Sequence, residues 1–228
     1  MLTIGVILSD TTFRRHPGDV GSPDSYACPV IFHVARGITA AGMVRAIPDE
    51  SLLDPNLQGA LALQERGADV ITTTCGFLAP LQDAIAERLR VPFVASSLLQ
   101  IPEIYKLVRG RIGIITANAE SFTPAHLDAA GISPTVPLAI RGLQDYTAFA
   151  EPLLRGIGEI DLVTVGDCVL QVAAQLMADF ADIKAFVCEC HNLPSSSAAI
   201  QQRTGKPVFD ILTLVGTVLQ ATAVPIYS

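Results

Sequence analysis

Short apolar runs and longer amphipathic stretches alternate along this 228-residue chain. The short runs are rich in β-branched residues and predict strands, whereas the longer stretches repeat their apolar positions with the period of a helix. The predicted strands cover residues 1–8, 29–34, 44–47, 68–74, 91–95, 111–116, 136–140, 183–188 and 207–209. The predicted helices cover residues 54–66, 79–90, 98–109, 123–130, 144–155, 161–182, a stretch that begins at 195, and 210–223. This alternation predicts an α/β fold with parallel sheets covered by helices on both faces.

The pattern of the first part of the chain returns in the second part. A shift of 115 residues carries Cys75 to Cys190, Ala84-Ile85 to Ala199-Ile200, Arg88 to Arg203 and Pro92 to Pro207. A shift of 108 residues carries the first apolar run, residues 4–7, to residues 112–115. Repetition of this kind indicates a duplication, so we predict two similar halves.

Each half places a cysteine at the carboxyl end of a predicted strand. Cys75 follows residues 68–74 and precedes Gly76, and Cys190 ends the corresponding strand of the second half. Open α/β sheets bind ligands at this edge. The amides at the start of the next helix favour a thiolate. If the halves face each other, the two thiols lie on opposite sides of a bound molecule.

Two opposed thiols can exchange a proton at a stereocentre without a cofactor. One thiolate removes the proton next to a carbonyl group, and the other thiol returns a proton from the opposite face. The backbone amides of Gly76 and Phe77, and those of His191 and Asn192, are placed to stabilise the developing negative charge. The pattern therefore predicts catalytic Cys75 and Cys190.

Polar residues at the ends of the first strands of both halves extend this predicted site. Ser9 and Asp10 follow the first strand, and Asn118 follows its counterpart in the second half. Their position on the rim of Cys75 predicts contact with the ligand. We add Thr74, which precedes Cys75, to the substrate-binding residues.

Composition and charge exclude several classes of protein. A net charge of −7 without a Lys/Arg cluster argues against nucleic-acid binding. The first residues form a strand and not a signal peptide, and no apolar run is long enough to predict a membrane span. Five cysteines do not indicate a secreted disulfide framework, so we expect a cytoplasmic protein with free thiols.

The segment from residue 13 to residue 26 is rich in Gly, Pro, Asp and Arg and is too long for an ordinary connection. It is either a lid over the site or a surface loop in which Arg14, Arg15 and His16 face water. Both alternatives fit the sequence.

The remaining cysteines carry weaker predictions. Cys28 and Cys168 are expected to be small core residues. Cys188, Cys190 and His191 could hold a metal ion, but zinc usually needs four ligands at recognisable spacing, so we predict no metal site.

The motifs resemble those of the aspartate/glutamate racemase superfamily, which includes hydantoin racemase, maleate isomerase and arylmalonate decarboxylase. Residues 72–77, with the sequence TTTCGF, resemble the Thr-Thr-x-Cys-Gly motif of its isomerase and decarboxylase branch. Cys190 followed by Pro194 resembles its second motif, Cys-Thr-x-x-Pro. The resemblance covers the whole chain.

The resemblance implies two pseudosymmetric Rossmann-like or flavodoxin-like domains with a cleft between them. It places the first domain at residues 1–96 plus 211–228 and the second at residues 97–210, with the C-terminal segment returning to the first. It implies chemistry without a cofactor and a dimer or larger homo-oligomer. It also places Ser9, Asp10, Thr116 and Asn118 in a pocket for the carboxylate of a small substrate.

We accordingly predict an isomerase: a cofactor-independent racemase or epimerase that acts next to a carboxylate or carbonyl, on an amino acid resembling aspartate or glutamate or on a hydantoin. Two alternatives stay open. One is a maleate cis–trans isomerase or an enzyme similar to arylmalonate decarboxylase, and the other is a small-molecule binding protein without turnover. Solvent-deuterium exchange distinguishes the catalytic alternatives from the binding protein.

Overall fold

Two parallel sheets with the same strand order form the framework of the protein. A computed structural model describes residues 1–46 and 49–223. The first sheet has the order β2-β1-β3-β4 and the second has the order β6-β5-β7-β8. The strands are β1 (Ile4–Ser9), β2 (Val30–Ala35), β3 (Val70–Thr73), β4 (Phe93–Val94), β5 (Arg111–Thr116), β6 (Leu138–Gly142), β7 (Ile183–Cys188) and β8 (Val208–Phe209). The identical order confirms the predicted α/β architecture with two similar halves.

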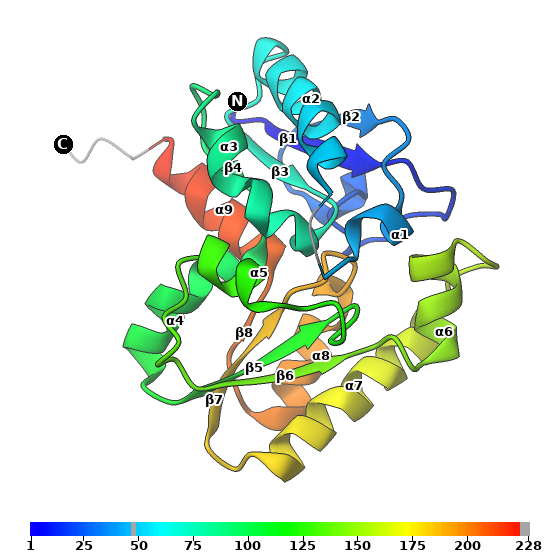
Figure 1. Cartoon of the computed structure of the whole chain (residues 1–228), viewed down its shortest axis with the longest axis vertical. Coiled ribbons are helices and arrows are strands. Elements are labelled where there is room, and N and C mark those ends of the chain that lie inside the picture. The colour runs from blue at the N-terminus through cyan, green and yellow to red at the C-terminus, as the bar shows by residue number, and fades with distance from the viewer. Residues whose placement is uncertain (47–48, 224–228) are drawn as a thin grey trace.

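Helices cover both faces of each sheet. The α-helices are α1 (Ala40–Met43), α2 (Leu53–Glu65), α3 (Gln82–Ala86), α4 (Ile101–Val108), α5 (Pro124–Ala129), α6 (Thr147–Phe149), α7 (Leu162–Asp179), α8 (Pro194–Thr204) and α9 (Ile211–Ala221). Short 3₁₀ segments are η1 (Pro23–Ser25), η2 (Glu50–Leu52), η3 (Gly76–Leu81) and η4 (Ser97–Gln100), and η5 (Ala150–Arg155) is a π-helix. In Figure 1 the blue and cyan half lies above the green, yellow and orange half.

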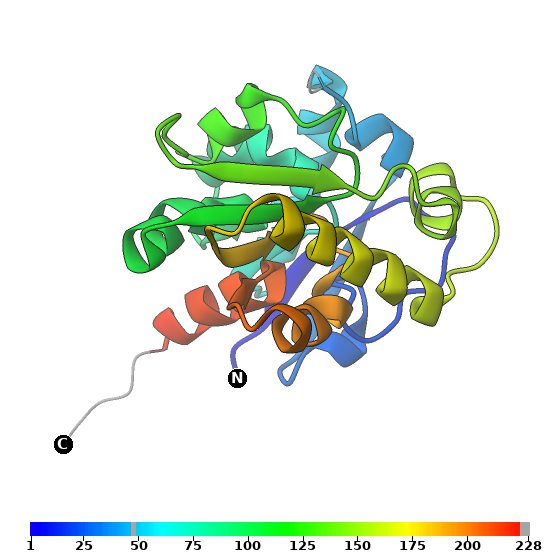
Figure 2. The same ribbon diagram turned by 90° about the horizontal axis from the view of Figure 1, so that it is seen from below.

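The last helix crosses back from the second half to the first. Ile211, Val215 and Leu219 of α9 share a buried apolar cluster with Ile4 and Val70 of the first sheet. Figure 2 shows this red helix beside the blue strands. Asp210 caps α9 by accepting a hydrogen bond from the Thr213 amide. The packing of α9 agrees with placing residues 211–223 in the first domain. The domain boundaries themselves stay a prediction.

Helix α7 lies against β5 and β6 of the second sheet, where Figure 2 shows it running beneath the strands. Its apolar positions Val165, Val169, Val172 and Leu176 are buried at the spacing of a helix. The length and apolar composition of α7 would allow it to span a membrane. In this structure 28% of the helix is buried within the protein.

Some predicted elements differ in the structure. Residues 44–46 of the predicted strand 44–47 have no strand pairing, because the short helix α1 occupies the preceding residues, and residue 47 lies outside the described part. The predicted helix 79–90 is replaced by η3 and the five-residue helix α3. Pro80 lacks an amide hydrogen and therefore favours the tighter turns of η3.

Candidate active site

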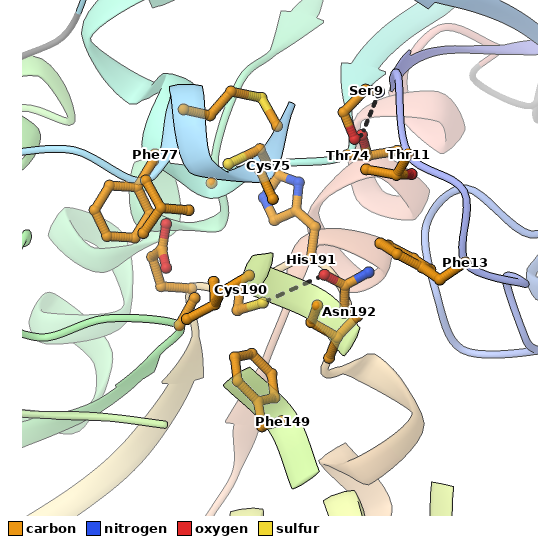
Figure 3. A pocket seen from close by; sticks show the side chains of 18 of the residues that line it. Ser9, Thr11, Phe13, Thr74, Cys75, Phe77, Phe149, Cys190, His191 and Asn192 are labelled. Carbon is orange, nitrogen blue, oxygen red and sulfur yellow. Dashed lines mark hydrogen bonds between the residues drawn. The ribbon is translucent and has the colours of Figure 1, made fainter. Parts of the chain in front are cut away.

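A cavity lies where the carboxyl ends of the strands from the two halves meet. It encloses about 430 Å³ of empty space, including the part that is open to solvent. Cys75 lies two residues after the end of β3, and Cys190 lies two residues after the end of β7. Both cysteines line the cavity, and Figure 3 shows them approaching each other from opposite sides. The predicted meeting of the two thiols is therefore present in the structure.

Burial dominates the chemistry of both thiols. It raises the pKa of Cys75 to about 12, and the charge of Glu189 adds to this, whereas the Phe77 amide and the Arg15 guanidinium lower it. Burial also raises the pKa of Cys190, with further contributions from Glu189, while the Asn192 amide lowers it. The amides of Phe77 and Asn192 thus favour the thiolates, but the effect of burial on the two pKa values is larger.

Three hydroxyl groups of the first half form a cluster at one end of the cavity. This hydroxyl cluster consists of Ser9 at the end of β1, Thr11 in the following turn, and Thr74 before Cys75. Arg15 Nη2 donates to Ser9 Oγ at 3.2 Å and to Thr11 Oγ1 at 3.0 Å. Ser9 Oγ and Thr74 Oγ1 lie 3.0 Å apart, and Thr74 Oγ1 also accepts from the Ser9 amide at 2.9 Å.

The loop that contains Arg15 closes the cavity from the side of the first half. Arg15 Nη1 donates to Asp19 Oδ1 at 2.9 Å, and the two side chains are only 11% and 8% exposed. Asp19 Oδ2 accepts from Asn192 Nδ2 of the second half at 2.6 Å. Cys190 Sγ in turn donates to Asn192 Oδ1 at 3.6 Å. The loop therefore joins the two halves, and the alternative in which Arg15 faces water is wrong.

Glu189 places a carboxyl group in the wall of the same cavity. The side chain is fully buried, and its Oε2 accepts from Thr116 Oγ1 at 2.7 Å. Its Oε1 has no hydrogen-bond partner among the described residues. Burial raises the pKa of Glu189 to about 7, although the bond from Thr116 and the nearby Ala117 amide lower it. Gly76 provides the space for this carboxyl group, because a Cβ at that position would lie 2.3 Å from Oε1.

His191 joins the end of β3 to the segment after β7. Its Nδ1 lies 2.8 Å from the Thr73 carbonyl oxygen, which only accepts, so Nδ1 carries the hydrogen. Burial lowers the pKa of His191 to about 4, so the ring is neutral at pH 7. Its Nε2 is buried without a hydrogen-bond partner in the described part of the chain.

The structure brings most of the predicted site residues together. The cavity is lined by both predicted catalytic cysteines and by five of the predicted substrate-binding residues, namely Ser9, Thr74, Gly76, Phe77 and His191.

Three predicted substrate-binding residues do not line the cavity. Asp10 turns to the rim, where it accepts from the Gly37 amide at 3.0 Å. Thr116 lies behind the wall because its hydroxyl is bonded to Glu189. Asn118 donates to Ser121 Oγ at 3.1 Å and lines a separate surface hollow. These residues lie at or just after the ends of β1 and β5, but hydrogen bonds to other residues hold their side chains away from the cavity.

Several residues of the cavity were not predicted. Arg15 and Phe13 come from the long loop, Met43 comes from α1, and Phe149 comes from α6. Glu189 could have been identified from the sequence, because the shift of 115 residues that relates Cys75 to Cys190 also relates Thr74 to Glu189. Neither the shift of 115 nor the shift of 108 residues carries the others onto a matching residue.

The other cysteines show no further chemistry. Cys188 is buried, whereas Cys28 and Cys168 are half-buried at the edges of the apolar clusters. No group of three or more His, Cys, Asp or Glu side chains within residues 1–46 and 49–223 is placed to hold a metal ion.

Sequence comparison relates the chain to proteins named as dimethylsulfoniopropionate lyases. It is 32% identical over 218 residues to a dimethylsulfoniopropionate lyase of Durusdinium sp. clade D, covering 92% of this chain and 71% of that protein. It is 30% identical to dimethylsulfoniopropionate lyase 7 of Emiliania huxleyi, covering 96% of this chain and 67% of the relative. No protein-family model matches the sequence.

Solved structures share the fold at low sequence identity. An arylmalonate decarboxylase superposes with a TM-score of 0.65 at 15% identity, covering 98% of this chain and 94% of the other. The aspartate racemase of Picrophilus torridus gives 0.60 at 11% identity, covering 97% and 94%. A glutamate racemase of Bacillus anthracis gives 0.61 at 13% identity, covering 98% and 83%. The fold that the resemblance to the aspartate/glutamate racemase superfamily implied is thereby confirmed.

The predicted activity is corrected by the sequence relatives. They are named as lyases, which contradicts the predicted racemase or epimerase and its assignment to the isomerases. The reason is chemical: a thiolate beside a carbon next to a carboxylate can start either racemisation or elimination, and the thiol pattern does not distinguish them. With this identity over nearly its whole length, the chain belongs to the family of the dimethylsulfoniopropionate lyases, built on the fold of the aspartate/glutamate racemase superfamily.

Proposed function

We propose that this protein is a lyase that cleaves dimethylsulfoniopropionate by β-elimination. A base removes a proton from the carbon next to the carboxylate, and the electron pair of that C–H bond forms the C=C bond of acrylate. The neighbouring C–S bond breaks, and its electron pair stays on sulfur as neutral dimethyl sulfide. The 32% identity over 92% of the chain to a protein of that name carries the proposal.

The hydroxyl cluster is the site for the substrate carboxylate. Ser9 and Thr11 accept from Arg15, and Thr74 accepts from the Ser9 amide, so these bonds use none of the three hydroxyl hydrogens. One hydrogen is used in the Ser9–Thr74 bond, which leaves two to donate to a carboxylate. The positive charge of Arg15 behind the cluster supports the binding of an anion.

Cys75 is the proposed base. Burial and Glu189 raise the pKa of both thiols, but Arg15 lowers the pKa of Cys75, whereas Cys75 and Asp19 raise the pKa of Cys190 further. Cys190 also acts as a donor to Asn192, which requires the protonated thiol. Elimination needs a base on one face only, so one thiolate and one thiol suffice. After turnover Cys75 holds the abstracted proton and loses it to solvent.

Product formation tests the proposal directly. We expect the purified protein to convert dimethylsulfoniopropionate into equal amounts of dimethyl sulfide, measured by gas chromatography, and acrylate, measured by NMR. Deuterium at the carbon next to the carboxylate is expected to slow the reaction, because that C–H bond is broken. Product at no more than the protein-free rate would refute the proposal.

The reaction is expected to accelerate with rising pH. Because burial raises the pKa of Cys75 to about 12, its thiolate fraction grows about tenfold per pH unit below that value. Initial rates at low substrate concentration between pH 6 and pH 9, with the protein-free rate subtracted, measure this rise. The substrate carboxylate stays ionised throughout the range. A flat or falling profile would contradict a thiol base.

A further inference from the structure

Glu189 is a buried acid that neither the proposed base nor the carboxylate site uses. Glu189 lines the cavity, Thr116 fixes one of its carboxyl oxygens, and the other is buried without a hydrogen-bond partner in the described part of the chain. A buried polar atom usually has a hydrogen-bond partner, and leaving it unpaired costs about 1–3 kcal/mol. The free oxygen is therefore available to a ligand that brings a hydrogen-bond donor or a positive charge to this position.

The cavity has two chemically different ends on either side of the cysteines. Figure 3 shows Ser9, Thr11 and Thr74 on one side of the two thiols and Phe77 on the other. Glu189 belongs to the Phe77 end, because its Oε1 reaches the neighbouring Gly76. The carboxylate site and the buried acid thus lie at opposite ends, with the thiols between them.

The internal repeat explains this difference. The shift that relates Cys75 to Cys190 relates Thr74 to Glu189, so equivalent positions carry a hydroxyl group in one half and a carboxyl group in the other. Each side chain is held by the neighbouring first strand, Thr74 by Ser9 of β1 and Glu189 by Thr116 of β5. The two halves of one pocket therefore present opposite chemistry to the two ends of a ligand.

A sulfonium group fits the Glu189 end. It is a permanent cation without an N–H or O–H group, so it is recognised by opposite charge and by contact with aromatic rings and apolar walls. Phe77, Phe149 and Met43 line the cavity and supply such contacts. A cation taken out of water without a counter-charge is strongly disfavoured.

We propose that the Glu189 carboxylate is the counter-charge of the substrate's sulfonium group and makes the site selective for zwitterions. This inference rests on the proposed lyase function, whose substrate carries a carboxylate and a sulfonium separated by two carbons. The bound cation favours the ionised form of Glu189 and also supplies positive charge near Cys75. The other charged or titratable groups near Glu189, which the charge of the bound cation would also affect, are Cys75, Cys190, His191, Arg15 and Asp19.

A matched pair of ligands tests the proposal without turnover. Dimethylsulfonioacetate and isovalerate have the same shape, but only the first carries a cation, and neither has a β leaving group. By calorimetry the wild type is expected to bind dimethylsulfonioacetate more tightly, and Glu189→Gln to weaken this binding at least about thirtyfold, because removing one partner of a buried charge pair is costly. Isovalerate affinity is expected to stay unchanged, which also shows an intact pocket.

Kinetics and a control variant complete the experiment. Sulfur loses its charge as the C–S bond breaks, so Glu189→Gln is expected to raise KM far more than it lowers kcat. Glu159→Gln removes an exposed carboxylate and is expected to keep the ligand preference. Equal binding of both ligands by the wild type, a preference retained in Glu189→Gln, or a loss confined to kcat would overturn the proposal. Calorimetric selectivity without dimethyl sulfide release would refute the lyase function alone.

Discussion

Replacing Cys75 with alanine is expected to lower kcat/KM for dimethylsulfoniopropionate by roughly 10²- to 10⁴-fold, the usual effect of removing a general base. The thiol is the group whose conjugate base the reaction needs, and Arg15 and the Phe77 amide lower its pKa against the effect of burial. Release of dimethyl sulfide at several substrate concentrations measures the change.

Cys190→Ala is the matched comparison for this prediction. It removes a thiol of equal burial that donates one hydrogen bond to Asn192, so we expect a loss of no more than about tenfold. Thermal unfolding of both variants shows whether either cavity has collapsed. If Cys190→Ala instead lost as much activity as Cys75→Ala, the assignment of a single thiol base would be wrong.

The internal repeat allowed much of the site to be predicted from the sequence. Equivalent strands of the two halves end at the same edge of their sheets. The repeat therefore correctly predicted that Cys75 and Cys190 line one cavity. The position of a residue after a strand does not fix the direction of its side chain. Asp10 and Asn118 show this, because bonds to Gly37 and Ser121 turn them away from the cavity.

The substrate was harder to predict because the residues that distinguish it do not follow the strand pattern. Arg15 stands in a loop rich in glycine and proline, where a charged residue is more often exposed, and only the folded loop pairs it with Asp19. Phe149 enters from a helix between two strands of the second half. Glu189 is adjacent to Cys190, and its burial depends on the space left by Gly76.

Replacing Arg15 with methionine is expected to reduce both stability and substrate affinity. The variant leaves Asp19 buried without its cation, and breaking a buried pair in this way costs about 3–5 kcal/mol in the free energy of unfolding. It also removes the donor to Ser9 and Thr11, so the hydroxyl cluster loses its orientation and nearby positive charge. Denaturant unfolding and the KM from dimethyl sulfide release measure the two effects.

A second substitution separates the role of Arg15 in folding from its role in binding. Adding Asp19→Asn to Arg15→Met removes the uncompensated charge, so we expect part of the lost stability to return. The Gly21 amide and Asn192 now bond different oxygens of Asp19, and asparagine keeps one oxygen that can accept from one of these two donors, so the recovery is expected to be incomplete. The raised KM is expected to persist, because no cation remains behind the hydroxyl cluster. If KM recovered together with stability, Arg15 would act through the fold of the loop and not through the substrate carboxylate.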